Sequence, residues 1–136
     1  MAEDKKFYVG QKAFIQKGSK VLILRDPDLG LDFPGGKIQE GETDFDEALR
    51  REVLEETGLQ IEIGEPFHRW FWKFGPGHRN AGKEVYLIGF RCSYLSGDVN
   101  LSDEHSESKW AKKGDFVDWN DGSPYFEALK VYFRGG

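Results

Sequence analysis

The sequence predicts an α/β fold in which a mixed β-sheet carries helices on both of its faces. Short apolar segments with strand-like alternation lie before and after one strongly acidic helical segment. A second helical pattern begins at Pro124. Strands on both sides of an internal helix, closed by a C-terminal helix, favour a sheet covered by helices. At 136 residues, the chain (1–136) is expected to be one domain that needs no disulfide.

Two strands are predicted ahead of the acidic helix. They cover Phe7 to Ile15 and Val21 to Arg25, and residues 17–20 form the turn between them. A loop from Asp26 to Gly30 leads into the segment Phe33 to Ile38. The proline and two glycines of that segment allow a sharp turn and a close approach of the backbone to a ligand or a helix.

Three further strands are predicted after the acidic helix. A short strand covers Leu59 to Ile63, and a longer one covers Phe67 to Phe74. Residues 75–82 are rich in glycine and form a hairpin tip, from which Lys83 to Tyr94 returns as the partner strand. The result is a sheet with strands from both sides of the helix.

The last helix has a clear start signal. Ser123 is the predicted N-cap and Pro124 occupies the first helical position, where its missing N–H costs nothing. Phe126, Leu129 and Phe133 then recur at helical spacing. This pattern predicts a helix that packs one apolar face on the sheet.

The acidity of the chain is one local feature. Residues 37–58 hold eight carboxylates and three cations, a balance of −5 that equals the net charge of the whole chain. Within them, Glu52, Glu55 and Glu56 stand at i, i+3 and i+4 and therefore share one helix face. Like charges at this spacing destabilise a helix by about 0.2–0.5 kcal/mol per pair.

Something must compensate for this repulsion. Arg51 stands four residues before Glu55 and can hold one carboxylate. A hard divalent cation with oxygen ligands can compensate for the others, while the alternative is a solvated acidic helix face. Gly58 is placed to end the helix. The segment is therefore predicted to be a loop-helix-loop motif whose carboxylates face one pocket.

The segment from Gly36 to Leu59, with its run REVLEETGL, resembles the Nudix box, the signature of hydrolases that cleave a nucleoside diphosphate linked to another group. The family pattern places seven residues between its first glutamate, here Glu42, and the arginine, whereas this chain has eight. Core spacing in the helix places the extra residue at Thr43 or Asp44, before the helix, and leaves the position of Glu42 open. The resemblance implies an α/β/α sandwich with a mixed sheet and a loop-helix-loop catalytic motif.

The resemblance also implies roles for individual residues. Glu52 and Glu56 would be the main ligands of Mg²⁺, for which Mn²⁺ could substitute, with the backbone carbonyl of Gly36 as a third ligand. Glu55 would supply an additional or water-mediated ligand. Arg51 would orient a carboxylate through a charge-assisted hydrogen bond. The alternative for Arg51 is an ordinary surface ion pair.

Members of this family often supply a further glutamate from a distant loop, as a metal ligand or a base. Glu104, followed by Glu107, is the candidate in the polar run 101–107 ahead of Trp110. Taken alone, such a run predicts only a solvated loop. The three histidines lack the spacing of metal ligands, which disfavours a zinc site.

The predicted activity is metal-dependent hydrolysis of a diphosphate bond. Phe33 to Ile38 and Gly41 to Thr43 are similar to the branch that converts nucleoside triphosphates to monophosphates and pyrophosphate, although ADP-ribose, nucleotide-sugar and dinucleoside-polyphosphate hydrolases share these residues. A nucleotide-binding regulatory module would be favoured by loss of a box carboxylate, and none is lost. An isomerase of isoprenoid diphosphates needs a catalytic cysteine, whereas Cys92 lies in a strand pattern and is expected to be buried.

The expected partner is a nucleotide or another small molecule that contains a diphosphate. Candidate walls for a base are Tyr8, Phe33, Trp70 and Trp72, and Arg79 and Lys83 could meet distal phosphates. No basic patch offsets the acidic box, so a nucleic acid polymer is disfavoured. Without an apolar leader or an 18-residue apolar run, neither secretion nor a membrane is indicated, and a cytoplasmic monomer or homodimer is expected.

Overall fold

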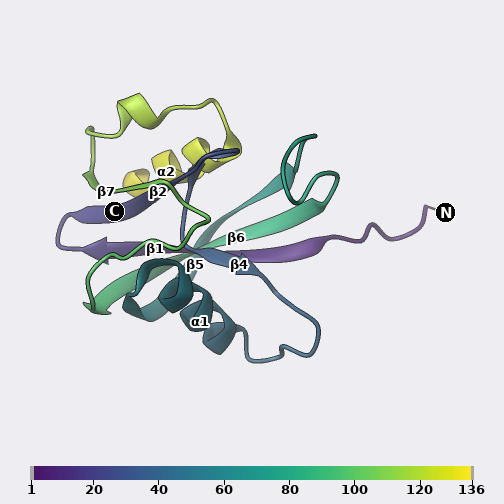
Figure 1. Ribbon diagram of the computed structural model, residues 1–136, viewed down its shortest axis with the longest axis horizontal. Coiled ribbons are helices and arrows are strands. Elements are labelled where there is room, and N and C mark those ends of the chain that lie inside the picture. The colour runs from purple at the N-terminus through teal and green to yellow at the C-terminus, as the bar shows by residue number, and fades with distance from the viewer. Residues whose placement is uncertain (1, 136) are drawn as a thin grey trace.

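The computed structural model describes residues 2–135, which form one mixed sheet with a helix on each face (Figure 1). The strands are β1 (Tyr8–Lys17), β2 (Lys20–Asp26), β3 (Gly30–Asp32), β4 (Gly35–Lys37), β5 (Gln60–Lys73), β6 (Glu84–Ser96) and β7 (Glu107–Lys112). The helices are α1 (Phe45–Thr57) and α2 (Pro124–Arg134), with a short 3₁₀ turn, η1 (Val117–Trp119), before α2. No helix within residues 2–135 is long and apolar enough to cross a membrane.

The sheet is mixed because one central pair of strands is parallel. Its main path runs β3-β2-β1-β6-β5, while β4 pairs with β1 and β7 pairs with β2. β1 and β6 run parallel, with Tyr8 opposite Val85 and Gln16 opposite Ser93. The other pairs are antiparallel. The predicted mixed sheet is confirmed.

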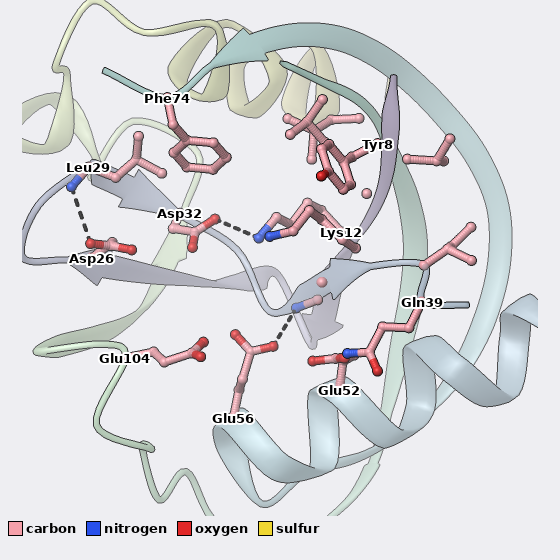
Figure 2. A pocket seen from close by; sticks show the side chains of 18 of the residues that line it. Tyr8, Lys12, Asp26, Leu29, Asp32, Gln39, Glu52, Glu56, Phe74 and Glu104 are labelled. Atoms are coloured by element: carbon pink, nitrogen blue, oxygen red, sulfur yellow. Dashed lines mark hydrogen bonds and ion pairs between the residues drawn. The ribbon is translucent and has the colours of Figure 1, made fainter. Parts of the chain in front are cut away.

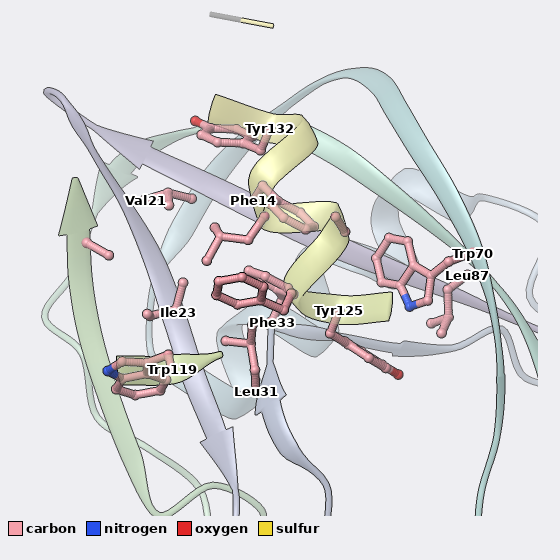
Figure 3. Close-up of a cluster of buried hydrophobic side chains, with 14 of the residues drawn as sticks. Phe14, Val21, Ile23, Leu31, Phe33, Trp70, Leu87, Trp119, Tyr125 and Tyr132 are labelled. Carbon is pink, nitrogen blue, oxygen red and sulfur yellow. The ribbon is translucent and has the colours of Figure 1, made fainter. Parts of the chain in front are cut away.

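Two hydrophobic cores lie on opposite faces of this sheet. Alternation along β1 sends Phe14 to the face covered by α2, and Ala13 and Ile15 to the face covered by α1. On the α2 side, Phe14 stacks on Phe33 with ring centroids 3.9 Å apart, and Tyr125 and Tyr132 of α2 complete the cluster (Figure 3). The α/β/α sandwich is therefore confirmed, with the sheet as its middle layer.

The end of α1 and the start of α2 lie where the sequence signals predict. The Asp44 side chain accepts a hydrogen bond from the Glu47 amide at 3.1 Å and caps α1, and Gly58 ends the helix in the left-handed conformation with φ of 78°. Thr43 and Asp44 thus precede α1, as the insertion required. Ser123 caps α2 through the Phe126 amide.

Several strands differ from the prediction. β5 is one long strand, where two were predicted, because register shifts on either side of Pro66 break the alternation without ending the pairing with β6. β3 and β4 were not predicted, since each has only three residues and shows no usable alternation. Residues 101–107 were expected to form a polar loop. The loop ends before Glu107, which is the first residue of β7.

Cys92 lies on β6 in the α1-side core and is 3% exposed. Burial raises the pKa of its thiol to about 12. At pH 8 we expect the reactive thiolate to be about a thousandfold rarer than for an exposed cysteine. A chromogenic thiol reagent should therefore react slowly with the native protein and rapidly in denaturant. Equal rates in the two states would contradict the buried position.

Candidate active site

One cavity of about 740 Å³ lies between β1, β4, α1 and the loop before β7 (Figure 2). Its acidic wall consists of Glu52, Glu56 and Glu104, and its apolar wall of Tyr8, Leu29 and Phe74. Lys12, Lys37 and Arg79 also line the cavity. Figure 2 shows the carboxylates of the acidic wall on one side, with Tyr8 and Phe74 on the other. A ligand of nucleotide size could touch both walls at once.

The three stacked glutamates of α1 do not all face the cavity. Leu49 and Val53 hold the inner face of the helix on the sheet. Glu52 and Glu56, four residues apart, both point from α1 into the cavity. The Glu56 side chain is only 5% exposed, whereas that of Glu55 is 59% exposed and lies outside the cavity. The helix thus presents two of its three glutamates to one site.

Two glycines let the backbone of β4 pass between β1 and α1. Gly35 has a φ of 146°, and a Cβ there would overlap the backbone carbonyl of Gln11. A Cβ on Gly36 would lie 2.8 Å from the carboxylate of Glu52. This close approach places the Gly36 backbone at the acidic wall, and it lets the Gly35 amide donate a hydrogen bond to Glu56 Oε2 at 3.1 Å.

Arg51 contacts three carboxylates, although the sequence predicted that it would hold one. Its guanidinium lies 2.8 Å from Glu42 Oε2, 3.2 Å from Glu52 Oε1 and 3.3 Å from Glu55 Oε1. Glu42 also accepts a hydrogen bond from the Gln39 amide at 2.6 Å. The position of Glu42, left open by the insertion, is therefore beside Arg51 and the start of α1. Arg51 can hold Glu52 in a fixed orientation through this cluster.

A buried chain of charged groups lies behind the acidic wall. Lys12 Nζ is 3.0 Å from Asp32 Oδ1, His105 Nε2 is 2.9 Å from Asp32 Oδ2, and His105 Nδ1 is 3.6 Å from Glu56 Oε1. Burial raises the pKa of Glu56 to about 8, although Lys12 opposes the shift. Burial would also raise the pKa of Asp32, but Lys12 and His105 outweigh it and hold that pKa well below its ordinary value.

Lys12, Asp32 and His105 belong to the site, although no sequence motif predicts them. The histidines lack ligand spacing, and the partners of His105 come from distant parts of the chain: Asp32 is 73 positions away. No local pattern reveals such a contact. Lys12 did carry a signal. It lies two residues before the core residue Phe14 on β1, so both side chains point to the same face of the sheet, and a lysine that points inward needs a partner.

The two candidate loop glutamates are in different places. Glu104 lines the cavity, with Oε2 3.9 Å from the guanidinium of Arg79. Glu107 begins β7 on the surface, where its carboxylate pairs with Arg25 Nε at 2.8 Å. The structure therefore brings together Gly36, Glu52, Glu56 and Glu104, and it leaves Glu55 and Glu107 outside the cavity.

The cations and aromatic residues of the cavity partly follow the expectation. Arg79 lines the cavity, whereas Lys83 contacts Asn80 at 3.3 Å. Burial lowers the pKa of Lys37, and repulsion from Lys83, Lys12 and Arg79 adds to the shift, so this side of the cavity is positive. Of the four aromatic residues expected in the walls, Tyr8 lines the cavity. The other three, Phe33, Trp70 and Trp72, belong to the α2-side core.

The acidic wall fits a divalent cation. Glu56, Glu104 and His105 can each offer one ligand atom, and these atoms lie within 4.8 Å of one another. Glu52 and the Gly36 backbone stand beside them. Carboxylate and carbonyl oxygens are the ligands that Mg²⁺ and Mn²⁺ prefer. A cation would also favour the ionised form of Glu56, which burial alone disfavours.

Comparison with known proteins defines the class of this enzyme. The family model of the NUDIX domain matches residues 9–130, so the chain belongs to the NUDIX domain family and is a Nudix hydrolase. It is 31% identical over 116 residues to the nucleoside triphosphatase NudI of Escherichia coli O81 (strain ED1a). The match covers 76% of this chain and 79% of that protein.

Solved structures agree with this assignment. The crystal structure of a MutT protein from Methanosarcina mazei Go1 superposes with a TM-score of 0.77 at 26% identity, covering 98% of this chain and 96% of the other. A NUDIX hydrolase from Nitrosomonas europaea superposes with a TM-score of 0.75 at 22% identity, covering 96% and 90%, which supports the fold alone.

Proposed function

We propose that this Nudix hydrolase is metal-dependent and converts nucleoside triphosphates to nucleoside monophosphates and pyrophosphate. The observation that carries the proposal is a single cavity in which an acidic wall faces an apolar wall, with Lys37 and Arg79 also lining it. A base can rest on the apolar wall while its phosphates reach the charged groups. The name of the relative NudI, a nucleoside triphosphatase, supports this substrate class.

The proposed metal ligands are Glu52, Glu56 and the backbone carbonyl of Gly36, all at the acidic wall. Mg²⁺, or Mn²⁺ in its place, would neutralise phosphate oxygens and acidify the attacking water when bound. Arg51 would keep Glu52 oriented through the contact at 3.2 Å. The ligand role of Glu55 stays a prediction, since its carboxylate faces Arg51 on the surface.

Other side chains would bind the substrate and move the proton. Tyr8 and Phe74 would flank the base, and Lys37 and Arg79 would bind the phosphates that leave as pyrophosphate. Glu104 is the proposed base, because it faces the cavity from a loop and is more exposed than Glu52 or Glu56. Arg79, 3.9 Å from Glu104, would hold the ionised carboxylate near the phosphates.

A substrate screen with Mg²⁺ tests the proposal. Nucleoside triphosphates should show the highest kcat/KM, and phosphate should appear only after a pyrophosphatase is added, because the expected product is pyrophosphate. ADP-ribose, nucleotide sugars and dinucleoside polyphosphates are the comparison arms. A higher kcat/KM for one of these would replace the proposed substrate, and binding without turnover of any would favour a regulatory module.

Glu104→Gln is expected to lower kcat by about tenfold or more with little change in KM, because a base acts mainly in the transition state. Glu107→Gln is the matched control, since it makes the same chemical change three residues away. Its exposed ion pair with Arg25 contributes at most about 1 kcal/mol to stability. Steady-state kinetics separate the two. The reverse ranking would transfer the role to Glu107, and two silent substitutions would confine catalysis to α1.

A further inference from the structure

We propose that His105 is a nitrogen ligand of a second cation site, formed with Glu56 and Glu104, which favours a first-row transition cation over Mg²⁺. The site shares Glu56 with the cation position proposed above and Glu104 with the proposed base, and it rests on the proposed function in these two respects. It differs in its donor set, because an imidazole nitrogen joins the carboxylate oxygens. The inference follows from the tautomer of His105, from its unpartnered nitrogen and from the groups behind it.

The surroundings of Asp32 decide which nitrogen of His105 carries a proton. Lys12 Nζ lies 3.0 Å from the Asp32 carboxylate, and the Phe33 amide donates to the same carboxylate at 2.8 Å. The Asp32 carboxylate therefore accepts from two donors, one of them a cation, and serves as an acceptor at this position. His105 Nε2, 2.9 Å from Asp32 Oδ2, must then be the protonated nitrogen. In the neutral imidazole, Nδ1 is left with a free lone pair.

No hydrogen-bond donor lies within bonding distance of that lone pair among residues 2–135. The His105 side chain is 2% exposed, and within residues 2–135 its Nδ1 has no hydrogen-bond partner. Glu56 Oε1 lies 3.6 Å from Nδ1 and is also an acceptor when it is ionised. Two buried acceptors that face each other are stabilised by a positive charge between them. A cation bound to both atoms supplies this charge, and a shared proton is the competing explanation.

The groups behind His105 match those that support metal-binding histidines elsewhere. Such a histidine usually donates its other N–H to a carboxylate, which fixes the ring and strengthens the ligand. Asp32 takes this part here, and Lys12 holds Asp32 in place from the other side. The ring of His105 is therefore oriented before any cation arrives, and a rigid ligand loses little entropy on binding.

The third ligand, Glu104, requires a small movement. Two ligands at about 2.1 Å from one ion lie at most about 4.2 Å apart, whereas the three ligand atoms spread over as much as 4.8 Å. Glu104 is half exposed and its side chain can rotate toward the other two. Figure 2 shows the Glu104 and Glu56 carboxylates side by side on the same wall. Glu56 Oε1 and His105 Nδ1, 3.6 Å apart, already lie within that limit.

The nitrogen ligand sets the choice of metal. Mg²⁺ takes oxygen ligands, whereas imidazole binds first-row transition cations well. Within that series Mn²⁺ is the weakest binder, so it is the most stringent probe, and its unpaired electrons report directly bound nitrogen. One equivalent of Mn²⁺ added to the metal-free protein should show a ¹⁴N coupling in pulsed electron paramagnetic resonance.

His105→Gln tests this coupling because glutamine can keep a donor to Asp32 while it removes Nδ1. The coupling should disappear, and Mn²⁺ should bind about 10–100-fold more weakly, whereas Mg²⁺ affinity should change by less than about threefold. His78→Gln is the matched control, because His78 is a histidine that lines the cavity beside the proposed site. It should keep the coupling. If His105→Gln fails to fold, wild-type protein labelled with ¹⁵N-histidine should show the coupling change from ¹⁴N to ¹⁵N.

Three results would overturn the inference. If bound Mn²⁺ shows no histidine nitrogen coupling in the wild type, the site has only oxygen ligands and a shared proton explains the contact between His105 and Glu56, while the proposed hydrolase function stands. If the coupling persists in His105→Gln and is lost in His78→Gln, the nitrogen ligand is His78 and not His105. A protein that binds neither Mn²⁺ nor Mg²⁺ would overturn this inference together with the proposed metal-dependent function.

Discussion

Glu56→Gln is expected to lower kcat by at least about a hundredfold, because it removes a negative charge from the proposed metal site. The fold should survive. The glutamine oxygen can still accept from the Gly35 amide, and the new N–H can donate to His105 Nδ1, which Glu56 faces at 3.6 Å. Removing one of the stacked charges also relieves repulsion along α1. Steady-state kinetics and thermal unfolding of the same samples separate catalysis from folding.

Glu55→Gln is the matched control for this variant. It makes the same change one position earlier on the same helix, but its carboxylate lies outside the cavity. We expect a smaller loss of kcat than for Glu56→Gln. Equal losses would indicate that the helix charge as a whole matters, and near wild-type turnover in Glu56→Gln would remove Glu56 from the site.

Thermal unfolding of these samples also has an expected pH dependence. Burial raises the pKa of Glu56 from 4.5 to about 8, so the metal-free native state holds a proton that the unfolded state releases between these values. Stability of the metal-free wild type should therefore fall as pH rises through this window. Glu56→Gln cannot release this proton, so its Tm should depend less on pH across the same range.

Removal of divalent cations is expected to abolish activity, and Mg²⁺ or Mn²⁺ should restore it. The same cations should raise Tm, because a ligand that binds only the native state stabilises it by about 2.7 kcal/mol at a concentration of a hundred times Kd. Glu56→Gln should show a smaller rise in Tm, since one ligand has lost its charge. Full activity in excess chelator would contradict the metal site.

Local signals in the sequence explain which parts of the fold were predictable. The end of α1 and the start of α2 were predictable, because Gly58 and Ser123 act on the backbone next to them. The long strands followed from alternation. β3 and β4 could not be predicted because three residues show no periodicity. β5 was predicted as two strands because the register shifts around Pro66 resemble a strand end.

The candidate site was predictable only where its residues belong to one segment. Spacing on α1 indicated Glu52, Glu55 and Glu56, but it could not show that Glu55 lies outside the cavity. Nor could it show that Arg51 contacts three carboxylates, since this depends on how the loop folds back to bring Glu42 to the helix. The buried group of Lys12, Asp32 and His105 joins three distant segments. These residues meet only when the sheet and the loop before β7 have folded, so no local sequence motif predicts their contact.

The parallel pairing of β1 with β6 has a consequence for how the chain acquires its activity during synthesis. β1 is made first, but its parallel neighbour is far along the chain, with Tyr8 opposite Val85. The acidic helix is thus complete long before the middle of the sheet can close, and such long-range pairing slows folding. Glu104 and His105 leave the ribosome later still. A nascent chain would therefore carry a complete Nudix box well before it had a cavity to use it in.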